Sequence, residues 1–435
     1  MSAAAEAPSV VILAAGLGTR MKSKKPKVLQ PLCGRPMIAW VVDQALELEP
    51  ANIVVVVGHG AAEVEEALVK SGQRERVELV VQEPQLGTGH AVQVAAPALF
   101  PEGNTPGTVI VLYGDMPCLE AESITQLLQA KDDLGPGGSA MLVACPDDPR
   151  GFGRVLFAEG DHDRVIGIVE EKDATPDQLA IDEVNLGVYA FDGAGLQEAL
   201  PKLANDNAQG EYYLTDVVAM LVDQDKPVVA VELEELDEAI GVNSLTHLAE
   251  ARWAIQMRIL EEHLANGVYI EDPASTWIDH GVTIGQGSRI LPSTVIRSGV
   301  TIGEGCEVGP FTHLRVGTVL EEGAEVGNFT ECKKSTIGSH SKAKHLSYLG
   351  DAKIGARANI GAGTIFANYD GKDKHVSIVE DGAFVGSGTV VVAPNTIGRG
   401  ATTGAGAVVV RGSQVEPDSV WVGVPAKPLT KKTPS

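Results

Sequence analysis

The stretch Val10-Val-Ile-Leu-Ala-Ala-Gly-Leu-Gly-Thr-Arg-Met21 opens with an apolar run of strand length that breaks into a glycine-rich turn. Lysines follow at once, in Lys24-Lys-Pro-Lys-Val-Leu29. A strand that ends in such a turn brings a polyphosphate against backbone N–H groups. The spacing fits neither the dinucleotide fingerprint nor the P-loop, because no Gly-Lys-Ser/Thr follows. The stretch predicts a nucleotide-handling loop, and the alternative is that Gly16 and Gly18 only turn a strand into a helix.

The bulk composition predicts two domains and argues against nucleic acid as a partner. A chain of 435 residues exceeds one ordinary core, and its formal net charge of -24 is the wrong sign for a phosphate backbone. The N-terminus lacks the basic region of a secretion signal, and the apolar run after it is too short to span a bilayer. We therefore expect a cytoplasmic protein without membrane insertion. Five cysteines without metal-ligand or disulfide spacing predict buried thiols in a reducing compartment: Cys33, Cys118, Cys145, Cys306 and Cys332.

From Ser9 to about Val242, apolar runs of strand length alternate with amphipathic helical segments. This alternation predicts a parallel sheet covered by helices on both faces. Ligands bind such sheets beyond the carboxyl ends of the strands. The predicted strands are Val10–Leu13, Ile53–Val57, Val77–Val81, Val109–Tyr113 and Ala140–Ala144, and the predicted helices include Met37–Leu48 and Ala61–Lys70.

Two further strand ends carry polar or glycine-rich strings. Gln82 ends one strand and precedes Leu86-Gly-Thr-Gly-His-Ala91, in which we expect Thr88 to cap the next helix. Tyr113-Gly-Asp115 closes another strand, and a carboxylate there is suited to hold Mg²⁺ against phosphate oxygens. Alone, a Gly-Asp pair is more often an ordinary turn. Together with the opening stretch, these strand ends predict a nucleotide and metal site.

The texture of the sequence changes after Ser244. One helical run reaches to about Asn266 and predicts a connecting helix. After Gly267, aliphatic residues recur every sixth position, usually with glycine nearby. A repeat this short predicts a β-helix whose triangular coils each contain three hexapeptides and stack an aliphatic ladder inside. The ladder comprises Ile284, Ile290, Ile296, Ile302, Val308, Leu314, Leu320 and Val326, and it returns at Ile354, Ile360 and Phe366, then at Val385, Val391 and Ile397.

Two places interrupt this six-residue phase. One lies between Val326 and Ile354 and is rich in lysine and histidine; the other, Asn368-Tyr-Asp-Gly-Lys-Asp-Lys374, predicts a loop ejected from a coil. Loops on a rigid scaffold are where function concentrates. For Lys342 and Lys344, solvated edge charges are the better interpretation.

The first half resembles the sugar-1-phosphate nucleotidylyltransferases in its opening stretch and in Pro26-Lys-Val-Leu29. In that signature the Arg and the Lys, here Arg20 and Lys27, face the triphosphate. The strings Gly151-Phe-Gly-Arg154, Glu170-Glu-Lys172, Asn185-Leu-Gly187, Gly210-Glu-Tyr-Tyr-Leu-Thr-Asp216 and Gly241-Val-Asn243 add a resemblance to the N-acetylglucosamine-1-phosphate uridylyltransferases.

That resemblance implies a site for UTP, sugar phosphate and Mg²⁺. It places Gly153, Glu170 and Asn185 at the sugar, and makes Asn243 the second metal ligand beside Asp115. The nucleotide- and sugar-binding residues it implies are Leu13, Ala14, Ala15, Gly16, Lys27, Gln82, Gly87, Thr88, Tyr113, Gly114, Asp115, Gly153, Glu170, Asn185 and Asn243.

The second half resembles the hexapeptide-repeat acetyltransferases. His345-Leu-Ser-Tyr-Leu-Gly-Asp351, Asn359-Ile-Gly-Ala-Gly and Asn368-Tyr369 are similar to the family of bifunctional enzymes that join acetylation of glucosamine 1-phosphate to uridylyl transfer. The resemblance implies acetyl-CoA as co-substrate, His345 as general base and a homotrimer with active sites between neighbouring β-helices. The implied residues for sugar phosphate and acetyl-CoA are Arg315, Lys333, Tyr348, Asn359, Ala362, Asn368, Tyr369, Ser387 and Ala405.

The fold implied is α/β: a Rossmann-like nucleotidyltransferase domain followed by a left-handed parallel β-helix of hexapeptide repeats. We expect a nucleotidyltransferase (pyrophosphorylase) domain at 9–243, a linker helix at 244–266, the acetyltransferase β-helix at 267–425 and a C-terminal tail at 426–435. Two departures from the family stand out. The β-helix before Arg315 is about two coils short, and Gly423 occupies a position where some relatives carry an Arg near coenzyme A.

Three functions compete on this evidence. The first is the bifunctional enzyme, the second a monofunctional nucleotidylyltransferase with a structural or regulatory β-helix, and the third a non-catalytic scaffold. A scaffold has no need for Lys27, Asp115 and Asn243 together, and an assembly-only β-helix has no need for His345 with Tyr348. The bifunctional interpretation is therefore preferred.

Overall fold

The computed structural model describes residues 7–16, 18–102 and 104–429. These residues form two compact units that meet between Ala254 and Ile255, within helix α8 (Leu245–Ala265). The helix expected over 244–266 is therefore present, and it carries the chain from one unit into the other. None of the described helices is both long and apolar enough to cross a membrane.

The first unit is built on a nine-stranded sheet. Its strands are β1 (Ser9–Ala14), β4 (Asn52–Val57), β5 (Glu78–Val81), β6 (Thr108–Tyr113), β7 (Ser139–Ala144), β8 (Gly153–Ala158), β9 (Asp161–Val169), β10 (Val184–Asp192) and β11 (Val228–Glu232), and β2 (Pro31–Leu32) pairs with β3 (Arg35–Pro36) outside it. The strand order is β5-β4-β1-β6-β10-β7-β11-β9-β8. β1 is parallel to β4 and β6, but β10 runs antiparallel to β6 and β7. The prediction of a parallel sheet is wrong at β10, and at β8 and β9, because an apolar run reports burial of both strand faces and not strand direction.

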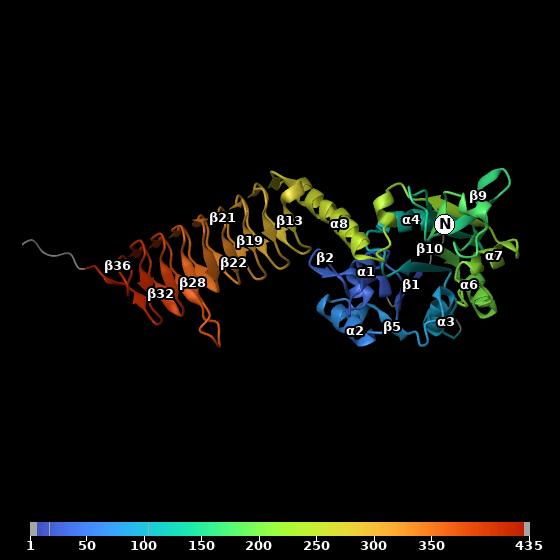
Figure 1. Ribbon diagram of the computed structural model, residues 1–435, viewed down its shortest axis with the longest axis horizontal. Coiled ribbons are helices and arrows are strands. Elements are labelled where there is room, and N and C mark those ends of the chain that lie inside the picture. Colours follow the sequence, from blue (N-terminus) through green and yellow to red (C-terminus); the bar gives the residue numbers. More distant parts are fainter. Residues whose placement is uncertain (1–6, 17, 103, 430–435) are drawn as a thin grey trace, which may run out of the picture. The chain divides into compact units, whose positions relative to one another are not determined.

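Helices cover both faces of this sheet (Figure 1). They are α1 (Met37–Glu47), α2 (Ala61–Lys70), α3 (Thr88–Leu99), α4 (Ala121–Asp133), α5 (Pro176–Leu179), α6 (Gly193–Ala199) and α7 (Asp216–Val222). Alternate residues of β1 enter two different cores: Val10 and Ile12 pack with residues of α1, α2 and α4, whereas Val11 and Leu13 pack with residues of α3, α6 and α7. The opening run is apolar throughout because both of its faces are buried.

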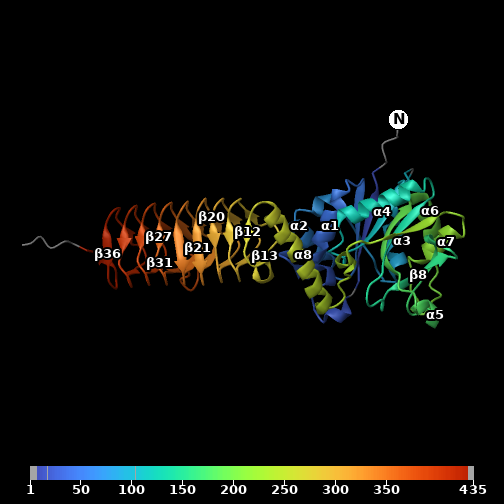
Figure 2. The same cartoon turned by 90° about the horizontal axis from the view of Figure 1, so that it is seen from above.

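The second unit is a β-helix with three parallel sheets. Sheet I contains β12 (Tyr269–Ile270), β15 (Arg289–Ile290), β18 (Glu307–Val308), β21 (Glu325–Asn328), β24 (Lys342–His345), β27 (Asn359–Ile360), β30 (Phe384–Val385), β33 (Thr402–Thr403), β36 (Val420–Val422) and the antiparallel β37 (Lys427–Pro428). Sheet II contains β13 (Trp277–Ile278), β16 (Val295–Ile296), β19 (His313–Leu314), β22 (Glu331–Lys333), β25 (Tyr348–Gly350), β28 (Ile365–Ala367), β31 (Val390–Val392) and β34 (Val408–Val409). Sheet III contains β14 (Thr283–Ile284), β17 (Thr301–Ile302), β20 (Val319–Leu320), β23 (Thr336–Ile337), β26 (Ala352–Ile354), β29 (Ser377–Val379), β32 (Asn395–Ile397) and β35 (Gln414–Val415). Figure 2 shows the coils stacked one on the next.

Strand register explains both interruptions of the six-residue phase. Ile302 pairs with Leu320, 18 residues on, which is one coil of three hexapeptides. Leu320 pairs with Ile337, only 17 residues on, so this coil is one residue short but otherwise continuous. Ile354 pairs with Val379, 25 residues on. The surplus forms the predicted loop between β28 and β29, which projects from the stack in Figure 1.

Two smaller expectations turn out differently. Cys33, Cys118, Cys306 and Cys332 are buried as predicted, but Cys145 is exposed because it lies just beyond the end of β7. The expected tail begins with β37, which pairs with β36, and residues 430–435 lie outside the described residues.

Candidate active sites

A cavity of about 470 Å³ opens at the carboxyl ends of β1 and β6. It brings together most of the residues predicted for the nucleotide: Leu13, Ala14, Ala15, Gly16, Lys27, Gln82, Gly87, Thr88, Tyr113, Asp115 and Asn243. Residues with no motif of their own complete the lining: Val28, Gln85, Ala91, Met116, Phe152, Leu186, Glu211, Ala239 and Gly241. The edge of the sheet therefore gathers the predicted set, as the strand ends indicated.

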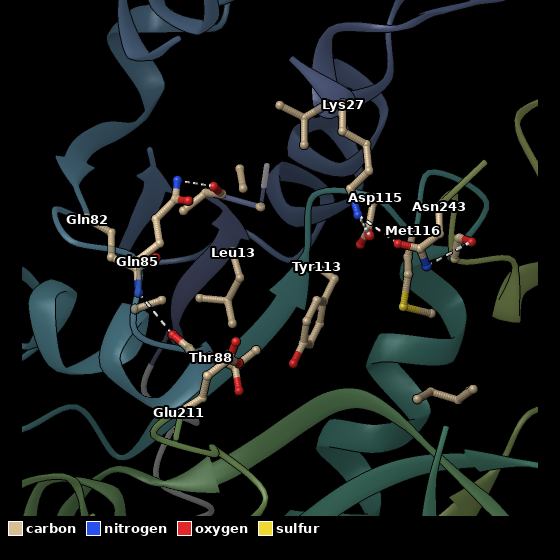
Figure 3. A pocket seen from close by; sticks show the side chains of 18 of the residues that line it. Leu13, Lys27, Gln82, Gln85, Thr88, Tyr113, Asp115, Met116, Glu211 and Asn243 are labelled. Atoms are coloured by element: carbon tan, nitrogen blue, oxygen red, sulfur yellow. Dashed lines mark hydrogen bonds and ion pairs between the residues drawn. The ribbon is translucent and has the colours of Figure 1, made fainter. Parts of the chain in front are cut away.

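Lys27 is the centre of the polar side of this cavity. Its Nζ forms an ion pair with the carboxylate of Asp115 and donates a hydrogen bond to Asn243 Oδ1 at 3.0 Å (Figure 3). The Lys27 and Asp115 side chains are only 11% and 14% exposed. Gly18 packs against this lysine with a φ of 59°, and a Cβ there would come within 2.7 Å of Lys27 Cβ. Glycine is thus required by both backbone conformation and close approach.

The backbone holds Asp115 beside Asn243 although they are far apart in the sequence. The carbonyl of Asp115, just after β6, accepts a hydrogen bond from the Val242 N–H at 2.8 Å. Asn243 directly precedes α8, where Ser244 Oγ accepts from the His247 N–H at 3.2 Å and caps the helix. Two oxygen donors therefore converge on one cationic atom.

The segment before α3 differs from the prediction. Gly87, not Thr88, is the N-cap, with a φ of 106° that suits glycine. A Cβ on Gly87 would lie 2.7 Å from the Tyr212 carbonyl oxygen. Thr88 Oγ1 instead accepts a hydrogen bond from the Leu214 N–H at 3.2 Å. The expectation that Thr88 caps the helix is wrong because a tertiary contact takes up its hydroxyl group.

Two predicted nucleotide residues do not line the cavity. Arg20 lies in the 3₁₀ turn Thr19–Met21 and is exposed, so its contact with the triphosphate stays a prediction. Gly114 has a backbone role: its N–H donates to the Leu13 carbonyl at 2.9 Å and ties β6 to β1.

The predicted sugar residues lie beside the cavity and not in its wall. Gly153 and Asn185 are register partners between β8 and β10, and their neighbours Phe152 and Leu186 line the cavity. Asn185 Nδ2 donates to Tyr189 Oη at 2.8 Å, a contact that the sequence pattern does not reveal.

Glu170 lines a second, acidic cavity of about 260 Å³, together with Asp173 and Asp216. It accepts a hydrogen bond from Thr215 Oγ1 at 3.1 Å. Burial, and after it the charges of Asp173 and Asp216, raises the pKa of Glu170 against the effect of that hydrogen bond.

The β-helix stacks one set of predicted residues at the corner between sheets I and II. Asn328 is the register partner of His345. Backbone hydrogen bonds from Gly363 to His345, from Gly388 to Ala362 and from Gly406 to Ser387 continue the same corner through successive coils. Consecutive coils thus carry Asn328, His345, Ala362, Ser387 and Ala405 at this corner. Gly423 comes next, because Thr403 pairs with Trp421.

His345 is oriented by a residue that the motif did not reveal. Its Nδ1 lies 2.8 Å from Asn328 Oδ1. An amide oxygen accepts, so this contact favours the tautomer with hydrogen on Nδ1 and leaves the Nε2 lone pair free to take a proton. The spacing of one short coil between Asn328 and His345 is the signal that finds this partner.

The other predicted residues gather at the corner between sheets II and III. Arg315 pairs with Glu331 at 2.7 Å, and Asn368, which is buried, donates to the Asp351 carboxylate. Lys333 lies near Lys374, whose ammonium, followed by Arg315, lowers the pKa of Lys333. Like charges held together favour an anion between them.

Tyr348 and Asn359 lie away from these corners. Tyr348 starts β25, and its Oη would be 2.6 Å from a Cβ at Gly350, so its ring lies along sheet II over that glycine. Asn359, in sheet I, is the register partner of Lys342. Tyr369 is 58% exposed on the loop.

The fold and these two sites define a class: a nucleotidyltransferase unit joined to a hexapeptide-repeat acyltransferase unit. Residues 10–221 match the MobA-like NTP transferase domain family, and residues 281–316 match the bacterial transferase hexapeptide (six repeats) family.

Relatives cover both units at once. The chain is 43% identical over 432 residues to the bifunctional protein GlmU of Shouchella clausii (strain KSM-K16), covering 92% of this chain and 93% of the relative. It is 42% identical over 433 residues to that of Geobacillus sp. (strain WCH70) and 40% identical over 432 residues to that of Bacillus subtilis (strain 168), with 92% of each chain covered in both cases. This chain belongs to the bifunctional GlmU family. The predicted fold and the predicted pair of uridylyltransferase and acetyltransferase activities are thereby confirmed.

Proposed function

We propose that this chain makes UDP-N-acetylglucosamine by acetylating glucosamine 1-phosphate at the β-helix and then transferring a uridylyl group to the product in the cavity of the first unit. The observation that carries the proposal is the presence of two chemically distinct clusters. Lys27 with Asp115 and Asn243 suits a metal-bound triphosphate, and His345 oriented by Asn328 suits removal of a proton from an amine.

The residues at the cavity fit Mg²⁺. The Asp115 carboxylate and the Asn243 amide oxygen already converge on one cation, the ammonium of Lys27, and both are the hard oxygen donors that Mg²⁺ prefers. When bound, Mg²⁺ supplies positive charge at the phosphate oxygens. Lys27, released from these two oxygens, pairs with the triphosphate, and Arg20 adds a second cation from the neighbouring turn.

Uridylyl transfer needs no protein nucleophile. A phosphate oxygen of N-acetylglucosamine 1-phosphate attacks the α-phosphorus of UTP, the bond from that phosphorus to the bridging oxygen of the β-phosphate breaks, and pyrophosphate leaves. Lys27 stabilises the charge on the phosphate oxygens. Gly153, Glu170 and Asn185, next to the cavity wall, are assigned to the sugar.

Acetyl transfer uses the free Nε2 of His345. The amine nitrogen of glucosamine 1-phosphate attacks the thioester carbonyl carbon of acetyl-CoA while Nε2 takes a proton from that nitrogen. The carbon–sulfur bond then breaks, and the proton passes from His345 to the departing coenzyme A thiolate. The cations Arg315 and Lys333 bind the sugar phosphate, with Tyr348, Asn359, Asn368 and Tyr369 around the sugar and Ala362, Ser387 and Ala405 along the coenzyme A groove.

A homotrimer brings these groups together. His345 follows sheet I, whereas Lys333 pairs with Gly350 at the far edge of sheet II, five positions beyond His345 on the neighbouring strand. At roughly 3.3 Å per residue the two edges are about 16 Å apart along one chain. A second copy that presents its sheet II/III corner to His345 shortens that gap.

Co-expression of two inactive variants tests this sharing. His345→Ala chains and Lys333→Ala chains are each expected to lack thiol release, and mixed trimers are expected to regain part of it because some sites combine two intact halves. If mixing restores nothing while mixed trimers form, the site lies within one chain.

One assay tests both activities. The purified protein is incubated with glucosamine 1-phosphate, acetyl-CoA, UTP and Mg²⁺, and free thiol and pyrophosphate are followed separately. Both are expected, with thiol first. Pyrophosphate that forms only when N-acetylglucosamine 1-phosphate is supplied would contradict acetyl transfer, and absence of both products would contradict the proposal as a whole.

A further inference from the structure

The loop between β28 and β29 is folded around the carboxylate of Asp370. Its Oδ1 accepts hydrogen bonds from the N–H groups of Lys372 at 2.9 Å and Asp373 at 2.7 Å. Its Oδ2 lies 2.6 Å from His375 Nε2. These partners all come from the loop or its end, so they close the loop on itself without fixing it to the β-helix.

Arg411 supplies that attachment from a distant coil. Its Nη1 donates to Asp370 Oδ2 at 3.2 Å, and its Nη2 lies 3.1 Å from His375 Nε2. Arg411 follows β34 at the corner between sheets II and III, and the Gly412 N–H donates to the Pro394 carbonyl at 2.7 Å, which fixes that corner to the preceding coil. We call Asp370, His375 and Arg411 the loop clamp.

The clamp is joined directly to residues assigned to acetyl transfer. The His375 N–H donates to the Asn368 carbonyl at 2.8 Å, and Tyr369 forms an antiparallel bridge with Lys374. The same bridge keeps Lys374 near Lys333, where the two charges affect one another. Any movement of the clamp therefore moves the backbone that presents Asn368 and Tyr369.

We propose that Arg411 is a positioning residue for acetyl transfer: through Asp370 and His375 it fixes the loop so that Asn368 and Tyr369 meet the sugar phosphate. The inference rests on the proposed acetyl-transfer site. The Asp373 N–H, followed by the contact with His375, holds the pKa of Asp370 well below its usual range, so the carboxylate is charged at working pH. An exposed pair of this kind adds little to global stability, and its effect is local ordering of the loop.

The test compares Arg411→Gln with Arg411→Lys and with Arg399→Gln, a matched exposed arginine on another corner of the β-helix. Hydrogen–deuterium exchange of peptides spanning 368–376 reports loop order, and thiol release reports acetyl transfer. Arg411→Gln is expected to speed exchange of this segment and to raise the KM for glucosamine 1-phosphate by about three- to fivefold, with a smaller change in kcat. Arg411→Lys is expected to recover most of the loss, because its ammonium still pairs with Asp370. Arg399→Gln and all pyrophosphate release are expected to be unchanged.

Each other outcome decides the question. Unchanged exchange in Arg411→Gln would overturn the clamp, and faster exchange with an unchanged KM would overturn its positioning role. An equal loss in Arg399→Gln would mean that the charge of this surface, and not the clamp, sets the KM. If the unsubstituted protein released no thiol, acetyl transfer itself would be wrong, while the exchange measurement would still show whether Arg411 orders the loop.

Discussion

The nucleotide cavity and the acetyl-transfer surface collect their residues in different ways. The cavity joins Leu13, Lys27, Asp115 and Asn243 through a mixed sheet whose strand order does not follow the chain. On the β-helix, Asn328, His345 and Ala362 meet because they occupy one corner of successive coils. Spacing along the sequence is therefore a direct measure of proximity in the second unit and carries little such information in the first.

Substitution of His345 is expected to have the largest effect and tests whether the two sites act separately. His345→Ala removes the proton acceptor, so thiol release is expected to fall by about 10²- to 10⁴-fold. Pyrophosphate release from UTP and N-acetylglucosamine 1-phosphate is expected to be unchanged, as measured with a coupled phosphate assay. A parallel loss of both would show that the sites are not independent.

Lys27→Ala is the converse experiment in the cavity. Loss of this cation is expected to lower pyrophosphate release by roughly 10²- to 10³-fold, since it removes stabilisation of charge on the phosphate oxygens. Thiol release from acetyl-CoA and glucosamine 1-phosphate serves as the folding control and is expected to persist. Should thiol release also stop, the division of labour between the two units would be wrong.

The contacts of Lys27 also predict a change in metal affinity. Its ammonium and a divalent metal ion compete for Asp115 and Asn243, so Lys27→Met is expected to bind Mn²⁺ about tenfold more tightly without nucleotide, because no charged hydrogen bond has to be broken first. Electron paramagnetic resonance of free Mn²⁺ measures this affinity directly. Lys24→Met, a substitution of an exposed lysine nearby, is the control, and an equal gain there would point to surface charge instead.

The smallest effect concerns pH at the acidic cavity. Because the pKa of Glu170 is raised, this carboxyl group takes up a proton at higher pH than an ordinary Glu, and the KM for N-acetylglucosamine 1-phosphate is expected to rise as pH falls on the acid side of neutrality. Asp216→Asn removes one like charge and lowers the pKa of Glu170. The rise in KM is then expected at more acidic pH, with about a two- to threefold difference at fixed acidic pH.

Asp206→Asn is the matched control for that measurement. Asp206 lines the same cavity but is not among the charges that raise the pKa of Glu170. A KM profile that shifts equally in both variants would mean that the net charge of the cavity matters and not the contact with Glu170.

The sequence by itself determined the coil architecture and most of the residues at both sites. A six-residue aliphatic period has one physical explanation, a stacked interior ladder, and the register of that ladder already aligns His345 with Ala362 and Ser387. The opening stretch likewise predicted a strand and a turn, since both follow from local burial and from the conformational freedom of Gly18.

Only the tertiary structure decided the direction of β10, the contact of Lys27 with Asp115, the use of the Thr88 hydroxyl and the acidic surroundings of Glu170. It also revealed Asn328 behind His345 and Arg411 behind the loop. These features depend on which distant segments are neighbours. Periodicity records whether a side chain is buried, but it does not record against which partner, and hydrogen bonds and charges act between partners.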